Sequence, residues 1–139
     1  MTTIAWDGKT IAADRLCSYH SNAVDKLVRM PDGSVCAGAG DSACVAELIA
    51  WIAGGASEKP TFPPDSMTVL QVFHGFRARY FQSRCVPFPV STTFFAIGSG
   101  ADYAMGAMAM GALACDAVKI AAQFDSDTGD GIDSITLGE

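Results

Sequence analysis

The residue with the clearest chemical potential is Thr2, which directly follows Met1. Because Thr2 is small, we expect Met1 to be removed, and this would expose the α-amine of Thr2. A terminal threonine carries a nucleophile, its hydroxyl, and a base, its own amine, in one residue. The reference pKa of an α-amine is about 7.7–8, so this amine can accept the hydroxyl proton near neutral pH. Threonine is also a common strand residue, so the pattern alone is a weak signal.

The elements that must position Thr2 are short strands, with helices in the middle and second half of the chain. Asp7-Gly8 is a two-residue hairpin turn, so strands at 2–6 and 9–13 should be neighbours. Asp41 or Ser42 can cap the helix that follows. The other predicted elements are strands at 34–39, 68–73, 76–81, 92–97 and 132–137 and helices at 42–53, 102–113 and 116–123. Two layers of strands with flanking helices imply an α+β fold.

Several short motifs occur in a fixed order along the chain. They are Ala12-Ala13-Asp14, Lys26, Gly38-Ala39-Gly40-Asp41, Ile97-Gly98-Ser99-Gly100 and Asp127-Thr128-Gly129-Asp130-Gly131. Together with Thr2 this ordered set resembles the proteasome β-subunit family, and within it the HslV-type threonine peptidases. The resemblance spans nearly the whole chain. It implies a single domain over residues 1–139, folded as the four-layer αββα sandwich of N-terminal nucleophile hydrolases.

The resemblance also implies roles for individual residues. Thr2 would attack a peptide carbonyl, and its amine, through a water, would accept the proton. Lys26 matches the family's catalytic lysine, whose charge would lower the pKa of the amine, and Asp14 matches the acid that holds this lysine. Gly38 matches the glycine whose backbone N–H forms the oxyanion hole, where a substrate carbonyl must approach closely. Ser99 matches a serine that hydrogen-bonds near the amine.

One more acid belongs to the candidate site, and three of the site residues also have non-catalytic interpretations. Asp127 matches the acid that supports the serine, although Asp130 stands where the proteasome subunits usually carry a serine. Without the resemblance, Lys26 reads as a surface lysine paired with Asp25. Asp14 then reads as a turn residue, and the glycine of the 34–39 strand as a small residue in a packed sheet.

One departure from the family concerns the cover of the sandwich. The family has a long second helix before the hairpin, but here the proline-rich stretch 54–67 occupies that place, so one helix of the usual set is missing. A bare sheet face costs about 25 cal/mol per Å² of exposed apolar area. We therefore expect a neighbouring subunit to cover it. Hydrophobic residues make up 50% of the chain and charged residues only 17%, as expected for a homo-oligomer.

Composition excludes several other classes. A net charge of −6 argues against nucleic-acid binding. The sequence has no signal-peptide pattern and no apolar run of transmembrane length, so we expect a cytoplasmic protein. The five cysteines, including Cys17, are scattered and read as free thiols of a reducing compartment. His20 and His74 lack ligand spacing, and the Asp-rich turn fails the EF-hand pattern, so no metal or cofactor is predicted.

These observations predict a threonine endopeptidase that cleaves polypeptides inside a homo-oligomeric ring. The resemblance adds an ATP-driven unfoldase as partner, although no docking feature is present in the sequence. Two alternatives stay open. One is a non-catalytic structural or assembly protein, which the low charge and the missing helix favour, and the other is a small-molecule amidase of the same class. The joint presence of Thr2, Asp14, Lys26 and Gly38 argues for activity, because a scaffold has no need of that set.

Overall fold

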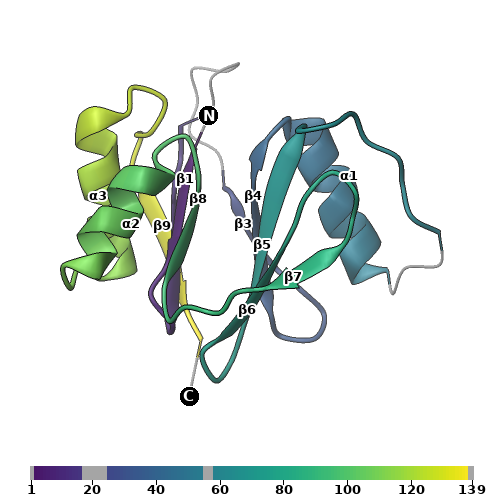
Figure 1. Ribbon diagram of the computed structural model, residues 1–139, viewed down its shortest axis with the longest axis horizontal. Helices are drawn as coiled ribbons and strands as arrows, with labels where there is room; N and C mark the ends of the chain where they lie inside the picture. The colour runs from purple at the N-terminus through teal and green to yellow at the C-terminus, as the bar shows by residue number, and fades with distance from the viewer. Residues whose placement is uncertain (1, 17–24, 55–57, 138–139) are drawn as a thin grey trace.

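The computed structural model describes residues 2–16, 25–54 and 58–137. It contains two antiparallel sheets that face each other (Figure 1). The first sheet has the strand order β8-β1-β2-β9, formed by Phe95–Gly98, Thr3–Trp6, Thr10–Asp14 and Ile132–Thr136. The second has the order β3-β4-β5-β6-β7, formed by Leu27–Arg29, Val35–Gly40, Met67–Phe73, Arg77–Phe81 and Pro87–Pro89.

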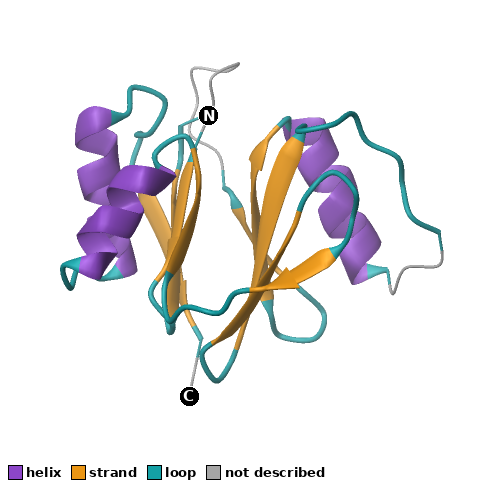
Figure 2. Ribbon diagram, viewed as in Figure 1, coloured by secondary structure: helices purple, strands orange, loops and turns teal. Residues whose placement is uncertain are grey.

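Helices cover the outer faces of both sheets (Figure 2). Helices α2 (Ala101–Ala109) and α3 (Ala114–Phe124) lie on the first sheet, and α1 (Ser42–Ala53) lies on the second. The layers therefore run helix, sheet, sheet, helix, and the predicted αββα sandwich is confirmed. Among the described residues, α1 is the only helix on its face, which agrees with the predicted loss of one helix.

Side chains at the helix ends fix where the helices begin and end. The Asp41 carboxylate accepts a hydrogen bond from the Cys44 backbone N–H at 3.0 Å, so Asp41 is the N-cap of α1. Helix α2 is shorter than predicted. It ends before Gly111, whose φ of +103° is a left-handed conformation that stops a helix. Periodic apolar residues continue beyond that point, which is why the sequence alone extended the helix to Leu113.

Strand β7 was not predicted. We expected Pro87 and Pro89 to end the hairpin unit, but the structure pairs Arg79 with Pro89 and Phe81 with Pro87 at the edge of the second sheet. Proline is tolerated on an edge strand because no further strand needs its missing N–H. Strand β3 was not predicted either, because the sequence suggested a polar loop up to Val28. The second sheet therefore has five strands where three were predicted.

Alternation along β1 explains how both faces of the first sheet are buried. Ile4 and Trp6 point between the sheets and are fully buried, whereas Ala5 points toward α2 and α3. Small side chains at this second face let the helices approach closely. Because β1 lies between β8 and β2, the chain just after Thr2 is held by hydrogen bonds on both edges.

The outer face of the second sheet is closed partly by side chains in place of the missing helix. Phe62, from the proline-rich segment, packs with Leu48 of α1 in one buried cluster. Farther along the sheet, the Arg79 guanidinium lies 5.5 Å from the centre of the Phe73 ring and 5.1 Å from that of Phe81. Stacked arginine and phenylalanine side chains can cover apolar surface while the charge stays near water.

The described cysteines are all free thiols, namely Cys36, Cys44, Cys85 and Cys115. Burial raises the pKa of Cys36 to about 12, so its thiol is unreactive near neutral pH. Cys17 and His20 lie outside the described residues. No helix within the described ranges is long and apolar enough to cross a lipid bilayer.

Candidate active site

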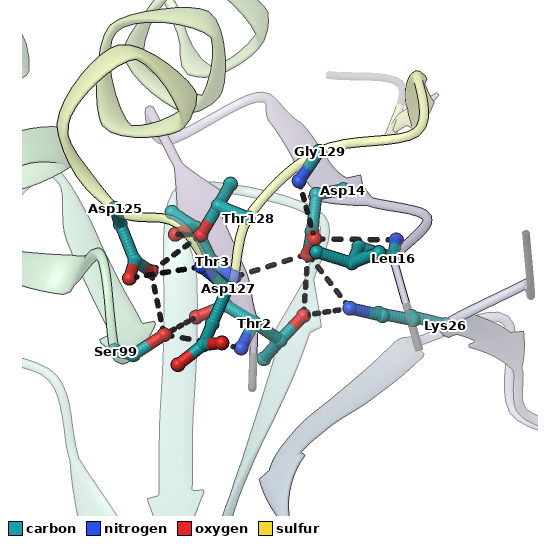
Figure 3. A network of polar contacts seen from close by, with 10 residues as sticks. All are labelled: Thr2, Thr3, Asp14, Leu16, Lys26, Ser99, Asp125, Asp127, Thr128 and Gly129. Carbon is teal, nitrogen blue, oxygen red and sulfur yellow. Dashed lines mark hydrogen bonds and ion pairs between the residues drawn. The ribbon is translucent and has the colours of Figure 1, made fainter. Parts of the chain in front are cut away.

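The Thr2 hydroxyl lies at the centre of a buried polar network (Figure 3). Thr2 is 3% exposed, and its Oγ1 donates a hydrogen bond to Asp14 Oδ1 at 2.5 Å. The Lys26 ammonium donates to the same Oγ1, and it also donates to Asp14 Oδ1 at 2.8 Å. The hydroxyl oxygen is therefore held between a carboxylate and a cation, and a neighbouring cation favours the deprotonated, nucleophilic form of a hydroxyl.

The Asp14 carboxylate accepts more hydrogen bonds than any other group of this network. Asp14 ends β2, and the register of β1 against β2 pairs Ile4 with Ala13, so Asp14 lies beside the start of β1. Its carboxylate is 1% exposed. The donors to it are Thr2 Oγ1, the Thr3 N–H at 3.1 Å, Lys26 Nζ, the Leu16 N–H at 3.3 Å and the Gly129 N–H at 3.0 Å. A buried carboxylate with this many donors is rigidly oriented.

Lys26 takes the predicted place beside Asp14 rather than the surface pair with Asp25. The Asp25 carboxylate lies 2.8 Å from Arg15 Nη1, and Arg15 also binds Asp133 at 2.7 Å. The Lys26 side chain is only 11% exposed, so its ammonium forms a largely buried ion pair with Asp14. The alternative reading of Lys26 as a solvent-exposed surface residue does not fit this geometry.

Gly38 lies near Lys26 because of the register between β3 and β4. Leu27 pairs with Ala37, so one step further along the two chains Lys26 comes opposite Gly38. A Cβ at Gly38 would stand 2.3 Å from a methyl carbon of Val45, so only glycine lets α1 pack here. This packing is sufficient reason for the glycine, and the oxyanion role of its N–H stays a prediction.

A second network holds the backbone nitrogen of Thr2. The Thr2 N–H donates to Ser99 Oγ at 3.3 Å, and Ser99 Oγ in turn donates to Asp125 Oδ2 at 2.6 Å. The Thr128 hydroxyl donates to the same oxygen at 2.6 Å and lies 2.7 Å from Thr3 Oγ1. The nitrogen that becomes the α-amine on loss of Met1 is thus held by a chain of hydroxyls that ends in a carboxylate.

The acid that accepts from Ser99 is Asp125, two residues before the predicted Asp127. Helix α3 ends at Phe124, and Asp125 follows with extended backbone (φ −104°, ψ 112°), which turns its side chain toward Ser99. Asp127 lies in the same network, where its backbone N–H donates to Asp125 Oδ1 at 3.3 Å (Figure 3). The expectation that Asp127 is the acid bonded to Ser99 is therefore wrong, and Asp125 takes that place.

Thr128 and Thr3 were missed by the sequence reasoning. A signal for Thr128 exists, because an aspartate whose side chain accepts from the backbone two residues later is a common turn-former. Asp125 does this with Asp127, and the Thr128 N–H donates to the Asp125 carbonyl at 3.1 Å. Thr3 gave no such signal, because its partner is distant in the sequence and becomes a neighbour only in the fold.

Gly98, the residue before Ser99, must be a glycine because its backbone lies very close to the backbone of Thr2. Gly98 has φ of +100°, and a Cβ there would stand 2.1 Å from the carbonyl oxygen of Thr2. Any other side chain would push β8 away from the residue that carries the nucleophile. The predicted strand-to-helix turn is thus one of the elements that fix the position of Thr2.

The Asp125 carboxylate makes stability depend on pH. Burial raises the pKa of Asp125, but hydrogen bonds from Ser99 and Thr128 outweigh it, and the net effect is a lowered pKa. A carboxyl group with a lowered folded-state pKa stabilises the protein above the unfolded value of about 3.9, and this contribution is lost as the pH falls through the folded value.

We therefore expect the free energy of unfolding to fall less steeply between about pH 5 and pH 2 in Asp125→Asn than in the wild type. Urea unfolding at several pH values measures the slopes. Ser99→Ala and Thr128→Ala remove the donors that lower the pKa, so both should flatten the profile as well. Equal slopes in all four proteins would contradict this assignment of the acid.

Comparison with known proteins identifies the fold. No protein-family model and no curated protein sequence matches the chain. Among solved structures, eukaryotic HslV from Trypanosoma brucei is similar, with TM-score 0.71, 16% identity and 99% of each chain covered. The chain has the HslV fold.

Two further structures share the HslV fold with the chain, both of BPH from Thiobacillus denitrificans. BPH in complex with epoxomicin has TM-score 0.70, 20% identity and 99% of each chain covered. BPH alone has TM-score 0.69 and 23% identity, with 99% of this chain and 98% of that chain covered. The resemblance inferred from the sequence is therefore confirmed at the level of the fold.

Proposed function

We propose that the chain is a threonine-type endopeptidase that uses Thr2 as its N-terminal nucleophile. The observation that carries the proposal is the position of Thr2 Oγ1 between the Asp14 carboxylate and the Lys26 ammonium. The nitrogen of the same residue faces the separate Ser99–Asp125 network. The proposed nucleophile, Thr2 Oγ1, thus contacts one network, and the proposed base, the nitrogen of the same residue, contacts the other.

The proposed reaction has two stages and begins after removal of Met1. The α-amine of Thr2, through a water, takes the Oγ proton while Oγ attacks the peptide carbonyl, and Lys26 stabilises the negative charge on Oγ. The Gly38 N–H donates to the oxygen of the tetrahedral intermediate. The C–N bond then breaks, the amine product leaves with the proton, and an ester on Thr2 remains. A water hydrolyses this ester and restores the hydroxyl.

The larger assembly is part of the same proposal. We place the chain in a homo-oligomeric ring in the cytoplasm, with polypeptides as substrates and an ATP-driven unfoldase as a possible feeding partner. Supporting it are the HslV fold and the second sheet, which α1 alone covers among the described helices. A neighbouring subunit against this face would bury apolar surface that a lone chain leaves in water.

Intact-mass spectrometry with a peptide epoxyketone tests the proposal directly. Epoxomicin is a suitable probe, because BPH has been solved in complex with it. We expect the untreated chain to lack Met1 and the treated chain to gain the mass of one inhibitor, which fragmentation should place on Thr2. The native mass of the same sample reports the number of subunits.

The other outcomes separate the alternatives. A processed chain that forms no adduct and cleaves no peptide would overturn the proposal in favour of a structural protein. An adduct together with hydrolysis of small amides, but not of peptides, would favour the amidase. Retained Met1 would leave the Thr2 nitrogen in a peptide bond, so the catalyst would not be assembled in that form.

A further inference from the structure

The guanidinium of Arg15 joins three segments of the chain near the proposed active site. Arg15 Nη1 donates to both carboxylate oxygens of Asp133 at 2.7 Å, and it lies 2.8 Å from Asp25 Oδ1. The Arg15 backbone N–H also donates to the Gly129 carbonyl at 3.0 Å. Arg15 follows β2, Asp133 lies in β9, and Asp25 lies two residues before the start of β3, so one side chain holds these segments together.

Arg15 and Asp25 each adjoin a residue of the polar network around Thr2. Arg15 directly follows Asp14, the last residue of β2 in the first sheet, and Asp25 directly precedes Lys26, which leads into β3 in the second sheet. Lys26 therefore reaches Thr2 Oγ1 and the Asp14 carboxylate from the opposite sheet (Figure 3). The position of its ammonium depends on how the segment before β3 is held against the first sheet.

Asp133 anchors the guanidinium to the first sheet. The aliphatic stem of Arg15 passes close to Gly131, where a Cβ would stand 3.6 Å from Arg15 Cδ, and its head reaches Asp133 two residues further along the chain. The side chains of Arg15 and Asp133 are 31% and 32% exposed, whereas that of Asp25 is 76% exposed. The partly buried pair thus fixes the guanidinium, and the exposed contact holds the segment that carries Lys26.

A contact of this kind has little influence on stability but can have a large influence on a reaction. An ion pair with an exposed carboxylate contributes about 0–1 kcal/mol to folding. A catalytic group that is displaced by about 1 Å can lower a rate by about 10²-fold, because the reacting atoms leave their productive geometry. The Lys26 ammonium contacts Thr2 Oγ1 directly, so a small movement of its segment changes the surroundings of the proposed nucleophile.

We propose that Arg15 is a positioning residue, which holds Lys26 against Thr2 by binding Asp25 and Asp133. These three side chains, Arg15, Asp25 and Asp133, are called the Arg15 clamp below. The inference rests on the proposed peptidase function, and it adds a device that acts through Lys26 rather than on the substrate.

Asp25→Asn tests the clamp with the smallest change to the structure. It removes the carboxylate that ties the Lys26 segment to Arg15, whereas the Arg15–Asp133 pair remains. For a peptide that the processed wild type cleaves, we expect kcat to fall by about tenfold with KM unchanged, because only the geometry around Thr2 is altered. The urea concentration at the midpoint of unfolding should stay close to the wild-type value, because the lost ion pair is exposed.

Asp116→Asn is the matched control for this variant. Asp116 is an exposed aspartate as well, and its carboxylate lies 3.8 Å from the Lys119 ammonium within α3, in an ion pair outside the polar network around Thr2. The control removes one exposed negative charge and one ion pair, as Asp25→Asn does. It should keep the wild-type kcat and KM.

Substitutions of Arg15 itself test whether the clamp acts as a unit. Arg15→Ala removes both of its ion pairs and should lower kcat at least as much as Asp25→Asn. The double variant should be no slower than Arg15→Ala alone, because both substitutions break the same contact. Arg15→Lys keeps a cation between the two carboxylates and should restore part of the rate that Arg15→Ala loses.

The outcomes separate the clamp from the peptidase function. If the wild type hydrolyses peptides and Asp25→Asn leaves kcat unchanged, the clamp is overturned and the peptidase function stands. A rise in KM alone, or effects of Arg15→Ala and Asp25→Asn that simply multiply in the double variant, would also overturn the clamp. If Arg15→Ala does not fold, Asp25→Asn decides. Absence of both epoxyketone adduct and turnover in the wild type would overturn the peptidase function and the clamp with it.

Discussion

Replacing Thr2 by alanine is expected to lower kcat for peptide hydrolysis by at least about 10³-fold, because the substitution removes the proposed nucleophile. The fold should persist. Asp14 and Lys26 still bind each other at 2.8 Å after the hydroxyl is lost, so no buried charge is left without a partner. The free energy of unfolding should fall by only about 1 kcal/mol for the missing hydrogen bond.

Two further variants complete this experiment. Thr10→Ala is the matched control, because Thr10 is another strand threonine, whose hydroxyl lies 2.9 Å from that of Thr136, away from the site. It should retain wild-type turnover. Thr2→Ser keeps a hydroxyl and should retain part of the activity. Hydrolysis by Thr2→Ala at the wild-type rate would exclude Thr2 as the nucleophile. If neither the wild type nor any variant hydrolyses peptides, the result favours the alternative that the chain is a non-catalytic structural protein.

The sequence predicted the parts of the fold that local chemistry decides. The Asp7-Gly8 turn specified the pairing of β1 with β2, and Asp41 specified the start of α1. Strand β7 could not be predicted, because its prolines disfavour a strand by propensity, and only the free edge of the second sheet makes them acceptable. Tertiary context overrode local preference at that point.

The site likewise contains residues that the sequence predicted and one that it did not. Asp14 and Lys26 were named from motifs, and the fold brings their side chains together on Thr2. Asp125 was missed because the turn contains several aspartates in a short stretch. Composition and spacing cannot say which of them points inward. The decision comes from where α3 ends, and helix ends are the least predictable feature of a sequence.

Asp14→Asn is expected to have the largest effect on stability. The carboxylate is 1% exposed and is bonded by the Lys26 ammonium at 2.8 Å and by the Gly129 N–H at 3.0 Å, among other donors. Asparagine keeps the shape, but it removes the charge and replaces one acceptor oxygen by a donor. The largely buried Lys26 ammonium then lacks its counter-charge. Loss of one partner of such a pair costs about 3–5 kcal/mol. Urea unfolding measures this, with Asp25→Asn as an exposed control of small expected effect.

A second substitution separates stability from catalysis. Lys26→Met removes the ammonium that Asp14→Asn leaves uncompensated, so the double variant should be more stable than the sum of the single effects by about 1–3 kcal/mol. Turnover should not recover with it, because neither the cation on Thr2 Oγ1 nor the carboxylate that accepts the hydrogen bond of this hydroxyl is restored. Simple addition of the two stability changes would mean that the Asp14–Lys26 pair contributes no coupling. Recovery of hydrolysis with recovered stability would mean that Asp14 and Lys26 only support the fold, and that the chemistry at Thr2 depends on the Ser99–Asp125 side of the site.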